Sequence, residues 1–175
     1  MRHQKQRLIK KFVGQISLSD GFATVTDPCY EHSSYSSVNI AVHRGAYNCY
    51  AYVYEDTPLK IRILQILAAN SEAAQLAEQL AEDDSNWSLK DYASVDSGQV
   101  GVFQYKPDFN RDEWRELCKW TWDEQQPHNP TGTGNCFIRV FEPDGNGYWV
   151  RTDDGDYPIY VLNADRETIG IELQL

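Results

Sequence analysis

Polar side chains that could do chemistry gather in three short motifs, which lie far apart in the chain. The motifs are Asp-Pro-Cys-Tyr at 27–30, Val-Asp-Ser-Gly-Gln at 95–99 and Gly-Asp-Tyr-Pro at 155–158. Each motif joins an acidic residue to a glycine or a proline, a combination that is typical of tight turns next to strands. If folding brings the turns together, their polar groups would form one binding site. The candidate ligand-binding residues are therefore Asp27, Tyr30, Asp96, Ser97, Gln99, Asp156 and Tyr157.

Two kinds of chemistry are open to such a site. Carboxylate, hydroxyl and amide groups can hold a small polar ligand without any catalysis. Alternatively, Asp27, Asp96 and Asp156 could serve a metal-assisted hydrolase, provided that the three carboxylates lie within about 5 Å of one another. The chain has no Gly-x-Ser-x-Gly elbow, phosphate-binding glycine loop or His-Glu-x-x-His motif. We therefore assign no catalytic residue, no resident metal and no cofactor.

The four cysteines do not indicate a further site. Cys29, Cys49, Cys118 and Cys136 are irregularly spaced and include no Cys-x-x-Cys pair, so the usual zinc and thioredoxin-like patterns are absent. Reduced, half-buried thiols are the expected state. No apolar run approaches the roughly 20 residues of a membrane helix, and no secretory signal follows the N-terminus. We expect a cytoplasmic protein without a membrane partner.

Charge is divided unevenly along the chain. The net charge is −10, yet residues 1–11 form a basic arm with five Lys or Arg side chains and no acidic one. The remaining residues carry 11 basic and 26 acidic side chains, a net charge of −15. Such an acidic body repels phosphate backbones, so nucleic acid is a disfavoured partner except through the arm.

Alternating apolar residues predict strands over most of the chain. The predicted strands are 8–17, 21–26, 38–43, 47–54, 59–67 (at least its first half), 89–95, 99–105, 136–141, 158–162 and 168–175. Turn signals at 19–21, 44–45, 96–98 and 163–165 predict hairpins between the strands on either side. Tyr50, Tyr52 and Tyr54 share one face of their strand, which indicates a half-buried sheet face more than a stacking platform for a ligand.

Two helices are expected between these strands. Ala73, Leu76, Ala77 and Leu80 recur at helical spacing after a capping residue at 70 or 71, which predicts a helix to about residue 82. Asn110 and a glutamate three residues later form a capping box, which predicts a second helix to about residue 124. No linker separates independent halves. We therefore predict that residues 12–175 form a single α+β domain, mainly an antiparallel β-sheet with two helices.

The order of the motifs resembles a loose group of uncharacterised bacterial and phage proteins. The similar segments are 27–30, 95–103, 114–121 and 155–161, which together touch most of the chain after residue 12. The sequence departs from that group at Gln104, where the group tends to have aspartate, and in a closing turn that is one residue tighter. The resemblance implies no activity, but it does imply a phage or bacterial origin.

These observations favour a non-enzymatic binding protein. It would capture a small polar ligand, such as a nucleotide signal, or block a host or bacterial protein. The alternatives are the metal-assisted hydrolase and an interaction subunit that uses the basic arm. Exposed strand edges would also allow a homodimer.

Overall fold

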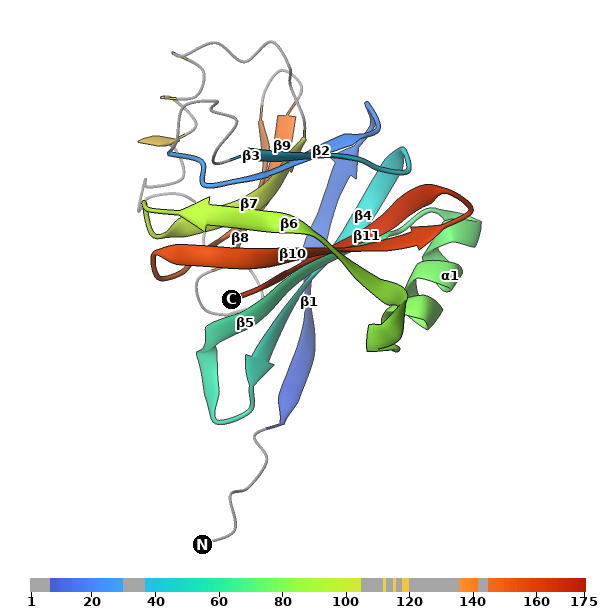
Figure 1. Ribbon diagram of the computed structural model, residues 1–175, viewed down its shortest axis with the longest axis horizontal. Coiled ribbons are helices and arrows are strands. Elements are labelled where there is room, and N and C mark those ends of the chain that lie inside the picture. Colours follow the sequence, from blue (N-terminus) through green and yellow to red (C-terminus); the bar gives the residue numbers. More distant parts are fainter. Residues whose placement is uncertain are drawn as a thin grey trace, which may run out of the picture.

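The computed structural model describes residues 7–29, 37–104, 112, 115, 118–119, 136–141 and 145–175. Within these residues the chain is mainly antiparallel β, with two sheets, one helix and a 3-10 turn (Figure 1). Sheet A has the spatial order β1 (Leu8–Leu18), β4 (Gly45–Tyr54), β5 (Thr57–Ala68), β11 (Glu167–Gln174), β10 (Gly155–Ala164) and β6 (Trp87–Val95). Sheet B has the order β3 (Ser37–Ala41), β2 (Phe22–Thr26), β7 (Gln99–Gln104), β9 (Gly145–Arg151) and β8 (Cys136–Phe141).

The two sheets face each other across one hydrophobic core. Strand β4 shows how the sequence produces this arrangement, because Tyr47, Cys49, Ala51 and Val53 are all fully buried while the residues between them are half-exposed. Strands β2, β7 and β9 contribute the opposing apolar side chains from sheet B. At the margins of the sandwich, β1 lies beside β8 and β3 lies beside β6. Edge strands of different sheets therefore border each other on both sides of the core.

The three predicted hairpins at 19–21, 44–45 and 96–98 are wrong. Each turn carries the chain from one sheet to the other, because β1, β4 and β6 belong to sheet A whereas β2, β3 and β7 belong to sheet B. Gly21 and Gly98 have positive φ angles of 80° and 72°, so the turn signal itself is real. A tight turn reverses the chain but does not decide whether the next strand pairs with the last one or crosses the core.

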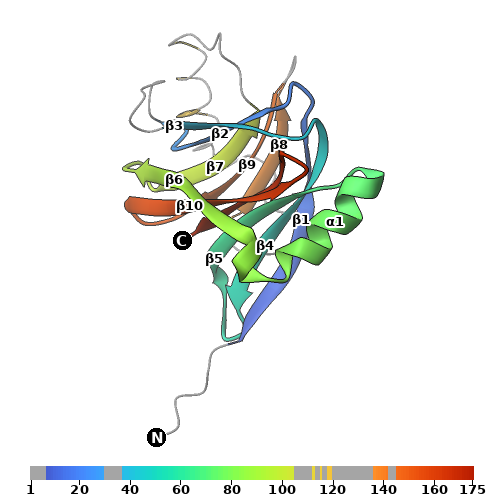
Figure 2. The ribbon, with the colours of Figure 1, turned by 45° about the vertical axis from the view of Figure 1, so that its right-hand side comes forward.

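Helix α1 (Ser71–Ala81) covers part of the outer face of sheet A (Figure 2). It contacts β5, β11 and β10, and Ala77 on its apolar side is fully buried. Gly170 of β11 lets neighbouring side chains pack directly against the backbone. An added Cβ there would lie only 2.9 Å from the Leu67 side chain and 3.2 Å from the Trp87 side chain. The indole of Trp87 also donates to the carbonyl oxygen of Ala81 at 3.4 Å. The 3-10 turn η1 (Asp84–Asn86) then leads into β6.

Several expectations about the elements can be compared directly with the structure. The first helix is confirmed, and the segment 59–67 is strand throughout. Strand β1 begins at Leu8, so the last four residues of the predicted basic arm belong to sheet A. The second predicted helix lies largely outside the described residues, although Asp112, Arg115, Cys118 and Lys119 are helical. In the described part of the chain, no helix is long and apolar enough to cross a membrane.

Candidate functional site

Asp27 is the centre of the cluster that the sequence motifs predicted. It follows β2 and is fully buried. Its carboxylate accepts hydrogen bonds from the backbone N–H groups of Cys29 (2.9 Å), Asp96 (3.0 Å) and Ser97 (2.8 Å), and from the Ser97 hydroxyl (2.5 Å). Donors of this number and kind can satisfy a buried carboxylate without a cation. Asp27 therefore fastens the β6–β7 turn to the end of β2.

The prediction of reduced thiols is wrong for two of the cysteines. Cys29 and Cys118, 89 residues apart, form a disulfide with Cα atoms 4.5 Å apart. Their spacing gave no hint of this, because the pairing follows from where the chain after β2 lies in space. The amide of Gln99, itself fully buried, lies 3.5 Å from the Cys29 sulfur. Cys49 is buried and keeps its thiol, which lies 3.9 Å from the carbonyl oxygen of Tyr47. Disulfides are typical of oxidising compartments rather than of the cytosol.

Asp156 and Tyr157 lie at the start of β10, next to the β9–β10 turn. The Ser94 hydroxyl donates to Asp156 at 2.6 Å, and the Tyr157 phenol donates to the carbonyl oxygen of Asp153 at 2.6 Å. This turn meets the β6–β7 turn through a backbone hydrogen bond of 2.9 Å from Thr152 to Gly98. The structure therefore brings most of the predicted residues to one end of the sandwich, while Tyr30 lies outside the described residues.

The contacts at this end hold turns in place. Asp96 contributes a backbone N–H to the Asp27 carboxylate, and Asp156 pairs across the sheet with Ser94. Among the described residues, no three His, Cys, Asp or Glu side chains are grouped so that they could hold a metal ion. The three aspartates of the hydrolase alternative are accordingly not brought together as ligands.

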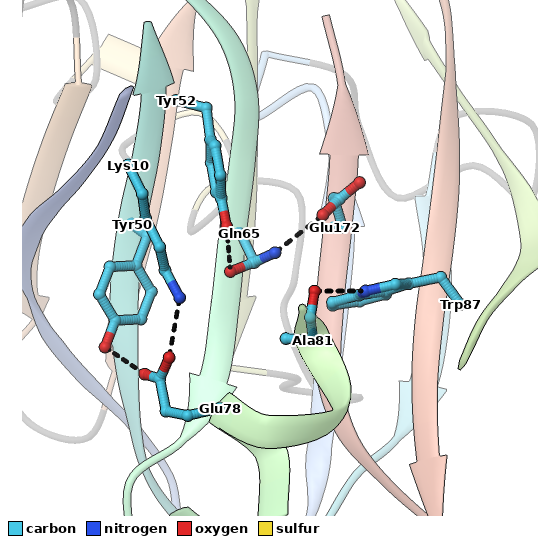
Figure 3. Close-up of polar contacts among 8 residues, drawn as sticks. All are labelled: Lys10, Tyr50, Tyr52, Gln65, Glu78, Ala81, Trp87 and Glu172. Atoms are coloured by element: carbon cyan, nitrogen blue, oxygen red, sulfur yellow. Dashed lines mark hydrogen bonds and ion pairs between the residues drawn. The ribbon is translucent and has the colours of Figure 1, made fainter. Parts of the chain in front are cut away.

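A second polar cluster lies on the outer face of sheet A, beside α1 (Figure 3). Gln65 and Glu172 point away from the core shared with sheet B, yet they are only 1% and 8% exposed. The Tyr52 phenol donates to the Gln65 carbonyl oxygen at 3.1 Å, and the Gln65 amide donates to Glu172 at 2.8 Å. Gln174 donates to the other oxygen of Glu172 at 3.1 Å. The buried carboxylate is thus satisfied by side-chain amides.

The same cluster fastens α1 to the edge of sheet A. Glu78 of the helix accepts a hydrogen bond from the Tyr50 phenol and forms an ion pair with the Lys10 ammonium at 2.8 Å (Figure 3). The Lys10 ammonium also lies 4.0 Å from the centroid of the Tyr50 ring. The three tyrosines of β4 do share one face, as the sequence predicted, but Tyr50 and Tyr52 are engaged in these internal contacts.

A groove lies between β3 and β6, on the side of the sandwich where these two edge strands border each other. Its volume is about 530 Å³. Ile40, Val42 and Val161 form a buried apolar floor, with 2%, 8% and 5% of their surfaces exposed. The remaining lining residues come from the end of β3, from the exposed edge of β6 and from the β10–β11 hairpin: Ala41, Ser88, Leu89, Lys90, Asn163, Arg166, Glu167 and Thr168.

Two cations line this groove in a protein of net charge −10. They are Lys90 of β6 and Arg166 of the β10–β11 turn. Neither side chain has a hydrogen-bond or ion-pair partner among the described residues. Asp165 and Arg166 have φ angles of 49° and 72°, so both residues of this turn adopt the left-handed backbone conformation. The one acidic lining residue, Glu167, is paired with His43 at 2.6 Å.

Sequence reasoning missed Lys90 and Arg166. They lie 76 positions apart on different elements, and neither belongs to a recognisable motif. The one available signal was Asn-Ala-Asp at 163–165, a turn between two strands. That signal predicted the hairpin correctly but not the groove beside it. Comparison with known proteins adds no candidate, because no family model, curated protein or solved structure matches the chain.

We predict that Asp27→Asn lowers the free energy of unfolding by about 2 kcal/mol, because an amide group would face backbone donors that need an acceptor. Asp154→Asn is the matched control, since this aspartate is exposed in the β9–β10 turn. It should change stability by less than about 0.5 kcal/mol. Urea unfolding of both variants tests the role of Asp27, and equal stabilities would contradict it.

Tyr52 gives a prediction at alkaline pH. Burial, followed by the nearby Glu172 charge, raises the pKa of Tyr52 from 10.0 to about 12. A folded-state pKa above the unfolded value gives stability that is present below pH 10 and is lost as the pH rises toward 12. The Tyr52→Phe variant has no phenol to ionise at this position, so it should not show this loss of stability at alkaline pH. Wild type should therefore be the more stable protein at neutral pH, and its advantage should shrink as the pH rises.

Denaturant unfolding measured across that range checks the alkaline prediction. Tyr92→Phe is the control, because this ring lies exposed on β6. Its free energy of unfolding should change with pH in the same way as that of wild type. If Tyr52→Phe also ran parallel to wild type, the cluster beside α1 would not disfavour the ionised phenol.

Proposed function

We propose that the protein is a non-enzymatic binding protein that holds a small anionic ligand in the groove between β3 and β6. One observation carries the proposal: Lys90 and Arg166 line an apolar-floored groove and have no partner among the residues that the structure describes, although the chain has ten more acidic than basic side chains. Unpaired cations beside an apolar surface suit a ligand that has an anionic group and an apolar body. The ligand would supply the counter-charge.

The dimensions of the groove fit this class of ligand. Small-molecule sites range from about 300 to 1,000 Å³, and the groove occupies about 530 Å³. Ser88, Asn163 and Thr168 add neutral polar groups next to the cations. A nucleotide signal would fit, with its base on the floor formed by Ile40, Val42 and Val161 and its phosphate at the cations. A short organic acid with an apolar chain would satisfy the same groups.

The motif cluster around Asp27 has a different part in this proposal. Its carboxylate and hydroxyl groups bond to one another and to backbone groups, so they support the turns that join the two sheets. We further propose that residues 12–175 form a single α+β domain with a second helix at 110–124. The helical conformation of Asp112, Arg115, Cys118 and Lys119 supports that helix.

We predict that wild-type protein purified from cells retains a small molecule in native mass spectrometry, and that Arg166→Gln loses it. Lys60→Gln is the matched control, because it removes one exposed positive charge from β5, outside the groove. The control should retain the ligand. A bare protein mass for wild type would contradict capture of a small ligand and would favour a protein partner. Equal retention by Arg166→Gln would place the ligand elsewhere.

A further inference from the structure

His43 and Glu167 form a close side-chain pair at the boundary of the groove. The imidazole Nδ1 lies 2.6 Å from a carboxylate oxygen of Glu167, and the two side chains are 33% and 60% exposed. Glu167 is the only acidic residue that lines the groove among the described residues. It is next in the chain to Arg166, one of the two unpartnered cations. The state of this carboxylate therefore decides how much positive charge the groove offers.

The position of His43 does not depend on its ring. Its backbone N–H donates to the carbonyl oxygen of Thr168 at 2.8 Å, and its own carbonyl oxygen accepts from the buried Tyr47 phenol at 2.7 Å. Both contacts use main-chain atoms of His43. The imidazole can therefore gain or lose a proton, or be replaced by another side chain, while the backbone stays fastened to β11.

The charged surroundings of His43 are mainly acidic. A smaller hollow of about 390 Å³ lies next to the groove and is lined by His43 together with Glu167 of β11, Glu72 of α1 and Asp165 of the β10–β11 turn. Arg44 follows His43 in the chain, and Arg166, which lines the groove, precedes Glu167 in the chain. Glu167 lines both the groove and the hollow and is paired with His43 rather than with Arg166, so a protonated His43 is positioned to keep this carboxylate from pairing with Arg166.

We propose that His43 and Glu167 make ligand binding in the groove sensitive to pH, a regulation that rests on the proposed function. When His43 is protonated, its charge holds the Glu167 carboxylate, and Lys90 and Arg166 are left for the anionic ligand. When the imidazole is neutral, the pair is weaker, and Glu167 competes with the ligand for the adjacent Arg166. Anion affinity falls as the pH rises through the range in which imidazole loses its charge.

The test uses 8-anilinonaphthalene-1-sulfonate as the probe, an anion with an apolar ring body whose fluorescence reports binding. The full chain is titrated at about pH 5.5 and about pH 8, on either side of the usual histidine transition. The variants are His43→Gln, which keeps a hydrogen-bond donor but not the charge, and Glu167→Gln, which removes the competing carboxylate. Arg166→Gln reports whether the probe binds in the groove. Lys60→Gln reports the effect of removing one positive charge outside the groove. Circular dichroism checks that each variant is folded.

Wild type should bind the probe about two- to five-fold more tightly at the lower pH than His43→Gln does, as expected for a partly exposed ion pair. The two proteins should converge at the higher pH. Glu167→Gln should bind at least as tightly as wild type at both pH values. It should also lose the part of the pH dependence that His43→Gln loses.

The outcomes separate the two proposals. If Arg166→Gln weakens binding but His43→Gln follows the wild-type pH profile, the groove binds anions and the pH-sensitive pair is overturned. If Arg166→Gln binds the probe as Lys60→Gln does, the groove is not the anion site and both proposals fail. General loss of negative charge at low pH would strengthen binding in every variant equally. Only a difference between wild type and His43→Gln supports the inference.

Discussion

The phenol of Tyr47 fastens the two sheets together where the groove ends. Tyr47 is fully buried in sheet A, and its hydroxyl donates to the carbonyl oxygen of His43, in the connection that arrives from sheet B. The N–H of His43 in turn donates to Thr168 in β11. Burial, and then the charge of Glu167, raise the pKa of Tyr47, so the phenol keeps the proton that it donates. The position of β3, the spacing between β3 and β6, and the contact between His43 and Glu167 all depend on these bonds.

Two strand edges that border each other without pairing create the space for a ligand. Strands β3 and β6 end their respective sheets, and apolar side chains from both sheets form the floor between them. Charge on β6 is also consistent with an edge that does not pair with another chain, because Lys90 and Asp91 lie exposed at its centre. The two buried carboxylates have internal partners, because Asp27 accepts from backbone donors and Glu172 accepts from two glutamine amides. The groove differs from both because its cations have no such partners among the described residues.

Local patterns in the sequence predicted most of the elements. They failed where the structure depends on contacts between segments that are far apart in the chain. The alternation in β4 and the helical spacing in α1 are visible because burial on one face imposes a period. The turns at 19–21, 44–45 and 96–98 were correctly located, but their strands enter different sheets, which no local signal encodes. Asp27 and Ser97 were grouped from their motifs, and the structure does join them. Lys90, Arg166 and the disulfide from Cys29 to Cys118 depend on contacts between distant segments, so spacing could not reveal them.

Hydrogen–deuterium exchange, compared between protein as purified and protein stripped of bound small molecules, tests the groove most directly. Occupation of the groove should slow exchange in β3, in the first half of β6 and in the β10–β11 hairpin, because these segments supply its walls. The turn after Asp27 and the tyrosine face of β4 should exchange equally in both samples. Protection confined to the β6–β7 and β9–β10 turns would instead place the ligand at the motif cluster and contradict the assignment of the groove as the binding site.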